Sequence, residues 1–374
     1  VREMMNDEGG FYAALDADSE GVEGKFYTWS KNEFEEVLGK DAALFAEYFD
    51  VSDTGNWEHT NILWVRKKAE IFSDEKGIDL KEFREKLQSV KERLLKKRDN
   101  RIRPLTDDKN LLGWNALMNT ALTKAGNALG DPAYIELARR NMKFLFENLK
   151  DTATAEWRHT FKNGTAKFSA FLDDYAYLIQ ALIVLHESTG EAGYLKQAVE
   201  LNQIVIDQYT DEKSPYFFYT PAGQDDIIVR KKDLYDGATP SANAVMAFNL
   251  FRLGLLTENR NWSEKAFHLL GATREMIIRY PLSFAYWAGL YIEQVVGVHE
   301  IAVIGKGAML KAREILHHYI PNKVLQFSET ADASMPMLRD KKPDEQIVYY
   351  LCRDYSCKKP VKELKEFIQL LETE

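Results

Sequence analysis

Residues 114–149 decide the fold, and they read WNALMNTALTKAGNAL, then GDP, then AYIELARRNMKFLFENL. Apolar side chains recur at helical spacing in 114–129 and again in 133–149. The break at 130–132 contains a glycine and a proline, which interrupt helices because glycine adopts left-handed backbone angles and proline lacks an N–H donor. The stretch therefore predicts two antiparallel helices joined by a short turn.

This pattern occurs three times, with Trp114, Asp174 and Ala242 at equivalent positions. Each of the three lies 8 residues before a leucine, 20 before an aromatic residue and 24 before an alanine. The matching residues are Leu122, Leu182 and Leu250, then Tyr134, Tyr194 and Trp262, then Ala138, Ala198 and Ala266. Alanine allows two helices to approach closely, so the repeat predicts an array of αα-hairpins.

The connections between hairpins are much longer than the turns within them. Turns of a few residues lie at 130–132, 190–192 and 258–261, whereas the connections cover 99–113, 150–172 and 210–240. All the long connections lead into the first helix of a pair, so we expect them at one end of the fold. Long loops in a compact domain often carry function. Further helices are expected at 33–48, 80–98 and 284–297.

The fold class predicted from these patterns is mainly α, an (α/α) toroid of helical hairpins over 1–298 followed by a small α/β lobe over 299–374. In the lobe we expect strands at 299–304, 323–327 and 347–352 and helices at 308–318 and 361–372. A closed ring of six hairpins needs twelve helices, but only about nine are indicated before residue 298. The chain also opens on VREMM, so we expect a toroid that is truncated at its start.

Composition narrows the function classes. The chain has 374 residues, 45% hydrophobic and 29% charged, with a net charge of -9. Such a chain folds compactly, and its acidity argues against general binding of nucleic acid or anionic membranes. No apolar run approaches the roughly 18 to 20 residues that span a bilayer, and no signal peptide is recognisable, so we expect a cytoplasmic protein with no membrane contact.

The chain shows no sequence pattern for a metal or cofactor site. The seven histidines lack the H-E-x-x-H spacing of zinc enzymes. Cys352 and Cys357 are too few for a disulfide framework, and their C-x-x-x-x-C spacing differs from the C-x-x-C of thioredoxin-like sites. We expect a structural or occasionally oxidised pair, and no cofactor.

Three acidic clusters stand at loop ends, where they are candidates for catalysis. Glycoside hydrolysis needs one protonated and one ionised carboxyl group on either side of a cleft. Asp18, Asp108 and Asp174 are the catalytic candidates, although aspartate is also a favoured helix cap. Neighbouring acids, amides and aromatic rings suit the hydroxyls and apolar faces of sugars. The substrate-binding candidates near these clusters are Asp16, Glu20, Trp114, Asn115 and Tyr175.

Two further loops add candidates. His159 is the preferred proton-transfer residue for a sugar epimerase, because histidine titrates near neutral pH, and Trp157 and Arg158 beside it are candidates for substrate binding. A loop histidine is also commonly a plain surface residue. Tyr235, Asp236 and Asn243 enter the third repeat and are the last candidates for substrate binding. Ser241 beside them is explained by helix capping alone.

Six segments together resemble the family that includes spermatogenesis-associated protein 20 and its bacterial counterparts. In chain order they are GGFYAALDADSEGVEGKFYTWSKNEFEEVLG (9–39), GNWEHTNIL (55–63), DDKNLLGWNALM (107–118), FLDDYAYLIQAL (171–182), YDGATPSANA (235–244) and CRDYSCKKP (352–360). The resemblance implies a thioredoxin-like domain followed by an (α/α)6 toroid of the six-hairpin glycosidase type, akin to N-acylglucosamine 2-epimerase. This chain resembles only the later part.

The leading functional hypothesis is a carbohydrate-active domain, with a sugar-like ligand and the thioredoxin-like domain of the full-length protein as its partners. Fold alone does not fix function. Two alternatives stay open, a non-catalytic scaffold that binds a ligand or partner and a helical protein with a vestigial site. The geometric expectation is that Asp18, Asp108, Asp174 and Asp236 face a shared hollow.

Overall fold

The computed structural model describes residues 2–152, 154–224, 227–332, 334–339, 341, 346–354 and 356–372. The chain forms two compact units. The small unit is Ala13–Asp108, and the hairpin unit is Val1–Tyr12 with Lys109–Glu374. Within the described residues, no helix combines the length and apolar character needed to cross a bilayer.

The small unit has a core of its own. It contains α1 (Lys31–Leu38), α2 (Ala42–Tyr48), α3 (Ala69–Glu75) and α4 (Leu80–Asp99), with two short strand pairs, β1 (Ala14–Leu15) with β4 (Thr106–Asp107) and β2 (Asp18–Ser19) with β3 (Val22–Glu23). The rings of Phe45 and Phe83 stack with their centroids 5.6 Å apart. Other aromatic and aliphatic side chains of the four helices complete this core.

The predictions for this part need two corrections. The single helix expected at 33–48 is two helices, because the chain bends at Gly39, whose φ of 54° is left-handed and favours glycine. The helices at 33–48 and 80–98 were assigned to the toroid, whereas they pack on each other within the small unit. The helical spacing was read correctly, but spacing does not say which core a helix covers.

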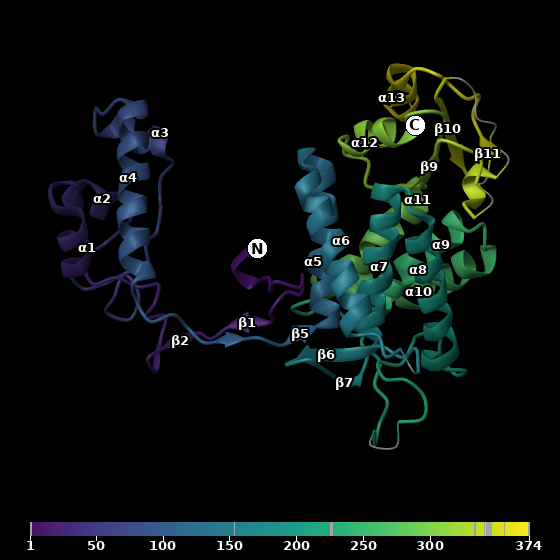
Figure 1. The fold of residues 1–374 in the computed structure, drawn as a ribbon, viewed down its shortest axis with the longest axis horizontal. Coiled ribbons are helices and arrows are strands. Elements are labelled where there is room, and N and C mark those ends of the chain that lie inside the picture. Colours follow the sequence, from purple (N-terminus) through teal and green to yellow (C-terminus); the bar gives the residue numbers. More distant parts are fainter. Residues whose placement is uncertain are drawn as a thin grey trace. The chain divides into compact units, whose positions relative to one another are not determined.

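The hairpin unit contains the three predicted hairpins (Figure 1). They are α5 (Leu112–Leu129) with α6 (Pro132–Asn148), α7 (Leu172–Thr189) with α8 (Ala192–Tyr209), and α9 (Ala242–Leu256) with α10 (Arg260–Arg279). Left-handed Gly130 and Gly190 end α5 and α7, and Pro132 opens α6. The equivalent alanines of the repeat, Ala138, Ala198 and Ala266, are fully buried.

The hairpins stand side by side with their first helices together. α7 packs against both α5 and α9, while α6, α8 and α10 each pack against the first helix of their own hairpin. α11 (Ala285–Val296) follows the short helix η3 (Pro281–Ser283) and contacts α9 and α10. Inner helices backed by outer helices are the arrangement of an (α/α) toroid, which is present here in part, so the predicted fold class is confirmed.

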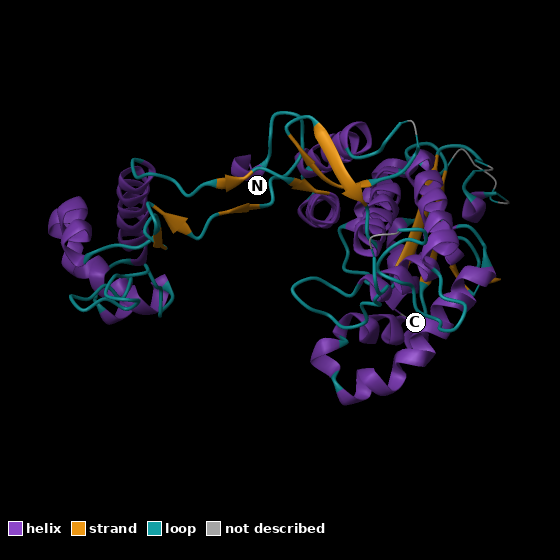
Figure 2. Cartoon of the chain, turned by 90° about the horizontal axis from the view of Figure 1, so that it is seen from below, coloured by secondary structure: helices purple, strands orange, loops and turns teal. Residues whose placement is uncertain are grey.

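The strands in the described part of this unit lie in two places (Figure 2). A sheet of β5 (Asn110–Leu111), β6 (Arg158–Lys162) and β7 (Thr165–Ser169) stands next to the start of α5. The C-terminal lobe has the strand order β11-β10-β8-β9, with β8 (His299–Ile304) parallel to β9 (Lys323–Ser328) and antiparallel to β10 (Val348–Arg353). α12 (Ala308–Leu316) links β8 to β9, and α13 (Leu364–Glu372) packs on β10.

The lobe matches the predicted strands and helices to within a few residues. Cys352 and Cys357 form a disulfide between β10 and β11 (Ser356–Cys357). The lobe docks on the C-terminal ends of the inner helices: the Leu325 N–H donates to the Glu187 carboxylate at 3.1 Å. The units divide at 12/13 and 108/109, and the lobe shares contacts with α7 and α9. The predicted boundary between 298 and 299 stays a prediction.

Candidate functional site

Asp174 organises a polar cluster at the start of α7. The side chain is fully buried. One carboxylate oxygen accepts from the Gly113 N–H at 2.8 Å, and the other accepts from the Phe171 N–H at 2.9 Å and contacts His159 Nδ1 at 2.7 Å. Asp174 therefore caps α7, ties α7 to the start of α5 and orients the imidazole ring.

His159 reaches Asp174 because β6 lies beside the helix starts. β6 pairs with β5, and β5 leads directly into α5. The Nδ1 contact with a carboxylate fixes the ring and leaves Nε2 as the nitrogen available to a ligand, since the side chain retains 25% exposure. Burial opposes the charged ring, but the hydrogen bond and charge of Asp174 outweigh burial, so the pKa of His159 is raised.

Asp173 is the second titratable group of the cluster. Burial, followed by the charge of Asp174, raises the pKa of Asp173 to about 6. The Tyr219 hydroxyl donates to Asp173, and the Tyr219 ring stacks on Phe171 with centroids 5.1 Å apart. Between pH 6 and the raised pKa of His159, the pair therefore holds a carboxylate on Asp173 and an imidazolium on His159. That combination is one base and one acid at the same pH.

The raised pKa of Asp173 predicts a pH-dependent effect of Asp173→Asn on stability. The folded state holds the Asp173 proton more tightly than the unfolded chain, so the contribution of Asp173 to stability falls as pH rises from about 4 to 6. Asparagine does not ionise, so the variant does not lose this stability as pH rises. We expect Asp173→Asn to raise the free energy of unfolding by about 1 to 2 kcal/mol at pH 8 and by nothing at pH 4, measured by urea unfolding. An equal effect at both pH values would contradict the raised pKa.

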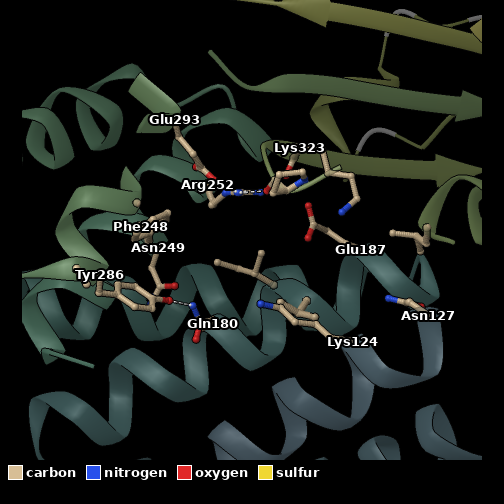
Figure 3. A pocket seen from close by; sticks show the side chains of 16 residues that line it. Lys124, Asn127, Gln180, Glu187, Phe248, Asn249, Arg252, Tyr286, Glu293 and Lys323 are labelled. Atoms are coloured by element: carbon tan, nitrogen blue, oxygen red, sulfur yellow. Dashed lines mark hydrogen bonds and ion pairs between the residues drawn. The ribbon is translucent and has the colours of Figure 1, made fainter. Parts of the chain in front are cut away.

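A cavity of about 380 Å³ lies among the inner helices and the C-terminal lobe (Figure 3). Polar side chains line it from each inner helix, at helical spacing within each helix. On α7 these are Gln180 and Glu187, and on α11 they are Tyr286 and Glu293. Lys124 and Asn127 lie on α5, Asn249 and Arg252 lie on α9, and Lys323 lies on β9.

The polar cluster and the cavity share one face of α7. Asp173, Tyr177 and Gln180 are spaced four and three residues apart, so they lie on the same side of the helix. Asp173 precedes Gln180 by seven residues, which is about 10 Å along the helix axis. Tyr177 lies between them, is almost fully buried and donates its hydroxyl to the Pro240 carbonyl at 2.6 Å. The cluster and the cavity are thus neighbouring but distinct.

Of the predicted catalytic residues, the structure brings together His159 and Asp174. Asp18 and Asp108 belong to the small unit, as do Asp16 and Glu20. Asp16 accepts from the Asp18 N–H at 3.2 Å, and Glu20 pairs with Lys25 at 2.8 Å. A hollow shared by Asp18, Asp108, Asp174 and Asp236 stays a prediction.

Three of the predicted binding residues of the hairpin unit are used in internal hydrogen bonds. Asp236 accepts from the N–H groups of Ser241 and Tyr286 at 3.0 and 2.9 Å, so it is a cap. Asn243 is buried and bonds the backbone of Phe217. Asn115 is likewise buried and bonds both backbone groups of Phe11. These three side chains hold loops against helices, and their predicted role in substrate binding stays a prediction.

The other five predicted binding residues divide into core and surface. Trp157 and Tyr175 are buried in the hydrophobic core. Trp157 lies directly before β6, and Tyr175 lies on α7. Arg158 pairs with Asp151 at 2.9 Å and with Glu156 at 3.3 Å. Trp114 and Tyr235 are exposed, at 51% and 63%, so their rings are accessible to a ligand.

Sequence reasoning missed Asp173 as a titrating group and missed all the cavity residues. A usable signal was present. Polar residues recur at three- and seven-residue spacing on helices that are otherwise apolar, as in Gln180 and Glu187 on α7. Such residues mark a helix face that lines a cavity rather than a packed core. No group of three or more His, Cys, Asp or Glu side chains suited to a metal ion occurs among the described residues.

The chain has sequence relatives among known proteins. No protein-family model matches the chain. The human spermatogenesis-associated protein 20 is 28% identical over an alignment that covers 99% of this chain and 53% of that protein. The chain is similar to spermatogenesis-associated protein 20 from end to end. The rat protein of that name is 29% identical with the same coverage, and an uncharacterised protein of Caenorhabditis elegans is 29% identical over 99% of this chain and 56% of its own. The chain spans about half the length of these relatives.

Among solved structures, cellobiose 2-epimerase from Spirochaeta thermophila overlaps 44% of this chain and 43% of its own, at 21% identity and a TM-score of 0.36. An α-mannanase of Bacteroides thetaiotaomicron overlaps 47% of this chain and 48% of its own, at 14% identity and a TM-score of 0.40. The fold class rests on the packing of the hairpins described above and not on these partial overlaps.

Proposed function

We propose that the hairpin unit is a carbohydrate-active domain in which Asp173 and His159 move a proton on a bound sugar. The observation that carries the proposal is the contact of 2.7 Å between Asp174 and His159 Nδ1, beside a second carboxyl group whose pKa is about 6. A base and an acid that coexist near neutral pH suit proton transfer next to a carbonyl group.

The proposed step needs no other participant. The Asp173 carboxylate takes the proton from the carbon beside the sugar carbonyl, and the electron pair of that C–H bond forms the C=C bond of an enediol. The carbonyl oxygen receives the proton of His159 Nε2. Once the enediol has rotated so that its opposite face meets Asp173, Asp173 returns the proton to the carbon on that face. His159 Nε2 takes back the hydroxyl proton, and the carbonyl re-forms with the carbon inverted. Asp174 touches neither reacting atom, so it is a positioning residue for His159.

The surroundings of the pair support a sugar as the ligand. Phe171 and Tyr219 present stacked rings next to Asp173, and Trp114 exposes its indole ring one residue after Gly113, which bonds Asp174. Aromatic rings bind the apolar faces of sugar rings, while carboxylates and amides bind their hydroxyls.

The test uses a panel of aldoses, ketoses, N-acetylhexosamines and disaccharides in D₂O with the whole chain. Proton NMR reports exchange of the C2 proton and any change of the anomeric signals, and thermal shift reports binding. We expect C2 exchange with at least one sugar of the panel. Binding without exchange would refute proton transfer, and neither binding nor exchange across the panel would refute the carbohydrate assignment.

A second candidate function is a non-catalytic scaffold that binds a ligand or partner alongside a thioredoxin-like domain in a longer protein. It is favoured by Asp174 and Asp236, because backbone N–H groups occupy both carboxylates. Binding of a sugar with no exchange in the same experiment would support it. The longer relatives, of which this chain covers about half, leave room for the additional domain.

A further inference from the structure

The cavity is lined by three cationic side chains, Lys124, Arg252 and Lys323, and by two carboxylates, Glu187 and Glu293. Arg252 forms an ion pair with Glu293 and donates to the carbonyls of Lys323 and, at 3.1 Å, Pro321. Glu187 accepts from the Leu325 N–H, and the largest charge effect on its pKa comes from Lys323. Lys323 in turn experiences Glu187 as its largest charge neighbour. Both carboxylates are thereby balanced by a cation.

Lys124 is the third cation of the cavity. The charges of Glu187 and Glu293 act on it, but each of these carboxylates interacts more strongly with another cation. Within the described part of the chain, the Lys124 ammonium makes no hydrogen bond and no ion pair, while Figure 3 shows it directed into the cavity from α5. The largest charge effect on Lys124 is repulsion by Arg252, which together with burial lowers the pKa of Lys124. The Lys124 side chain is exposed to the cavity, whose lining holds three cations and two carboxylates, so a bound anion would supply the missing negative charge. The position is unusual in a chain of net charge -9.

The neutral groups of the cavity are arranged for hydroxyls. Gln180 Nε2 donates to the Tyr286 hydroxyl at 2.5 Å, so these two polar side chains are linked to each other at the cavity wall. Asn249 Nδ2 donates to the Ala176 carbonyl at 2.8 Å, which leaves the Asn249 amide oxygen as an acceptor. Phe248 meets the Tyr286 ring edge to face with centroids 5.0 Å apart, which adds an apolar wall.

We infer that this cavity binds a sugar acid, with its single carboxylate on Lys124 and its hydroxyls on Gln180, Asn249 and Tyr286. The inference rests on the carbohydrate part of the proposed function and is independent of proton transfer at His159. One unmatched cation suits one negative charge. A phosphate ester carries close to two negative charges at neutral pH, and burying the second without a cation would be unfavourable. The volume of about 380 Å³ lies within the range of small-molecule sites.

The test compares D-glucuronate, D-glucose and D-glucose 6-phosphate by isothermal titration calorimetry with the whole chain. The three probes differ only at C6, which carries a carboxylate, a hydroxymethyl group or a phosphate ester. We expect D-glucuronate to bind at least about tenfold more tightly than either of the others, since a hydrogen bond to a charged group contributes about 1.5 to 3 kcal/mol. Equal affinity for D-glucose and D-glucuronate, or tightest binding of the phosphate, would overturn the inference.

Substitutions of Lys124 test whether the carboxylate of the bound sugar acid contacts this residue. Lys124→Gln should abolish the preference for D-glucuronate, and Lys124→Arg should keep it. Lys196→Gln, which changes an exposed lysine on the outer helix α8, is the matched control and should bind like the parent chain. Retention of the preference in Lys124→Gln would overturn the assignment. The selectivity of the parent chain tests the inference even where a variant does not fold.

Outcomes for the two proposals are separable. Selective binding of D-glucuronate without C2 exchange in the sugar panel supports the sugar-acid cavity and refutes proton transfer. Exchange on neutral sugars with no preference for the acid refutes the sugar-acid cavity and leaves proton transfer intact. Acetate at the same concentration reports whether charge alone accounts for binding, and acetate binding as tightly as D-glucuronate would overturn the role of Gln180, Asn249 and Tyr286.

Discussion

Replacing His159 by glutamine is expected to lower the rate of C2 proton exchange by at least about 100-fold, with little change in stability. Glutamine can still bond Asp174, but it cannot donate and recover a proton near neutral pH. The imidazole is oriented by the 2.7 Å contact of Nδ1 with Asp174, so its loss removes the acid while the fold around α7 keeps its cap. The measurement is exchange in D₂O with the most responsive sugar of the panel, alongside urea unfolding of the same variant.

The matched control is His268→Gln, which changes an exposed histidine on the outer helix α10. It should exchange at the parent rate. A rate for His159→Gln within about threefold of the parent would be far below the usual contribution of a general acid and would remove His159 from the mechanism.

The same assay should show a bell-shaped pH dependence. Asp173 must be ionised to act as a base, so the rate rises as pH increases through about 6. His159 must be protonated to act as an acid, so the rate falls as pH increases through its raised pKa. Asp173→Asn removes the base and should reduce exchange throughout the range. A pH profile without a fall on the alkaline side would contradict His159 as the acid.

Asp174→Ala is expected to lower the free energy of unfolding of the hairpin unit by about 3 kcal/mol. The side chain is fully buried, and it satisfies the N–H groups of Gly113 and Phe171 at 2.8 and 2.9 Å. Alanine leaves both donors unsatisfied in a site from which water is largely excluded, and it also removes a negative charge from the start of α7. Urea unfolding followed by circular dichroism at pH 7 measures the change.

Asp207→Ala on the outer helix α8 is the control, because Asp207 is exposed and, among the described residues, accepts one side-chain hydrogen bond, from Gln203 at 2.7 Å. It should change stability by less than about 0.5 kcal/mol. Comparable values for Asp174→Ala and Asp207→Ala would show that the N–H groups of Gly113 and Phe171 find other partners. In that case Asp174 would not be the residue that ties α5 to α7 or holds His159 in place.

The hairpins were predictable from the sequence because their signals are local. A helix needs apolar residues on one face, and its ends need residues with special backbone preferences. The sequence supplies both at Gly130, Pro132, Gly190 and Ser241. The strands of the lobe were equally readable, since β8 is a run of apolar residues bounded by glycines.

The division into units was not predictable, because it depends on which apolar faces meet. Phe45 and Phe83 fit a toroid helix and a separate core equally well until the structure pairs them. The same holds for Asp173, whose sequence position fits an ordinary helix start. Only burial and the neighbouring charge of Asp174 raise its pKa, and both depend on the tertiary fold.

The repeat, the helix ends within the three hairpins and the choice of His159 among the histidines were readable from the sequence. The fold was needed to show that β6 brings His159 to Asp174, that Asp236 and Asn243 bond backbone groups, and that Lys124 lines a cavity. The physical reason is the range of the interactions. Capping and helical periodicity act within a few residues of the chain, whereas desolvation and ion pairing depend on side chains that folding brings together from distant positions.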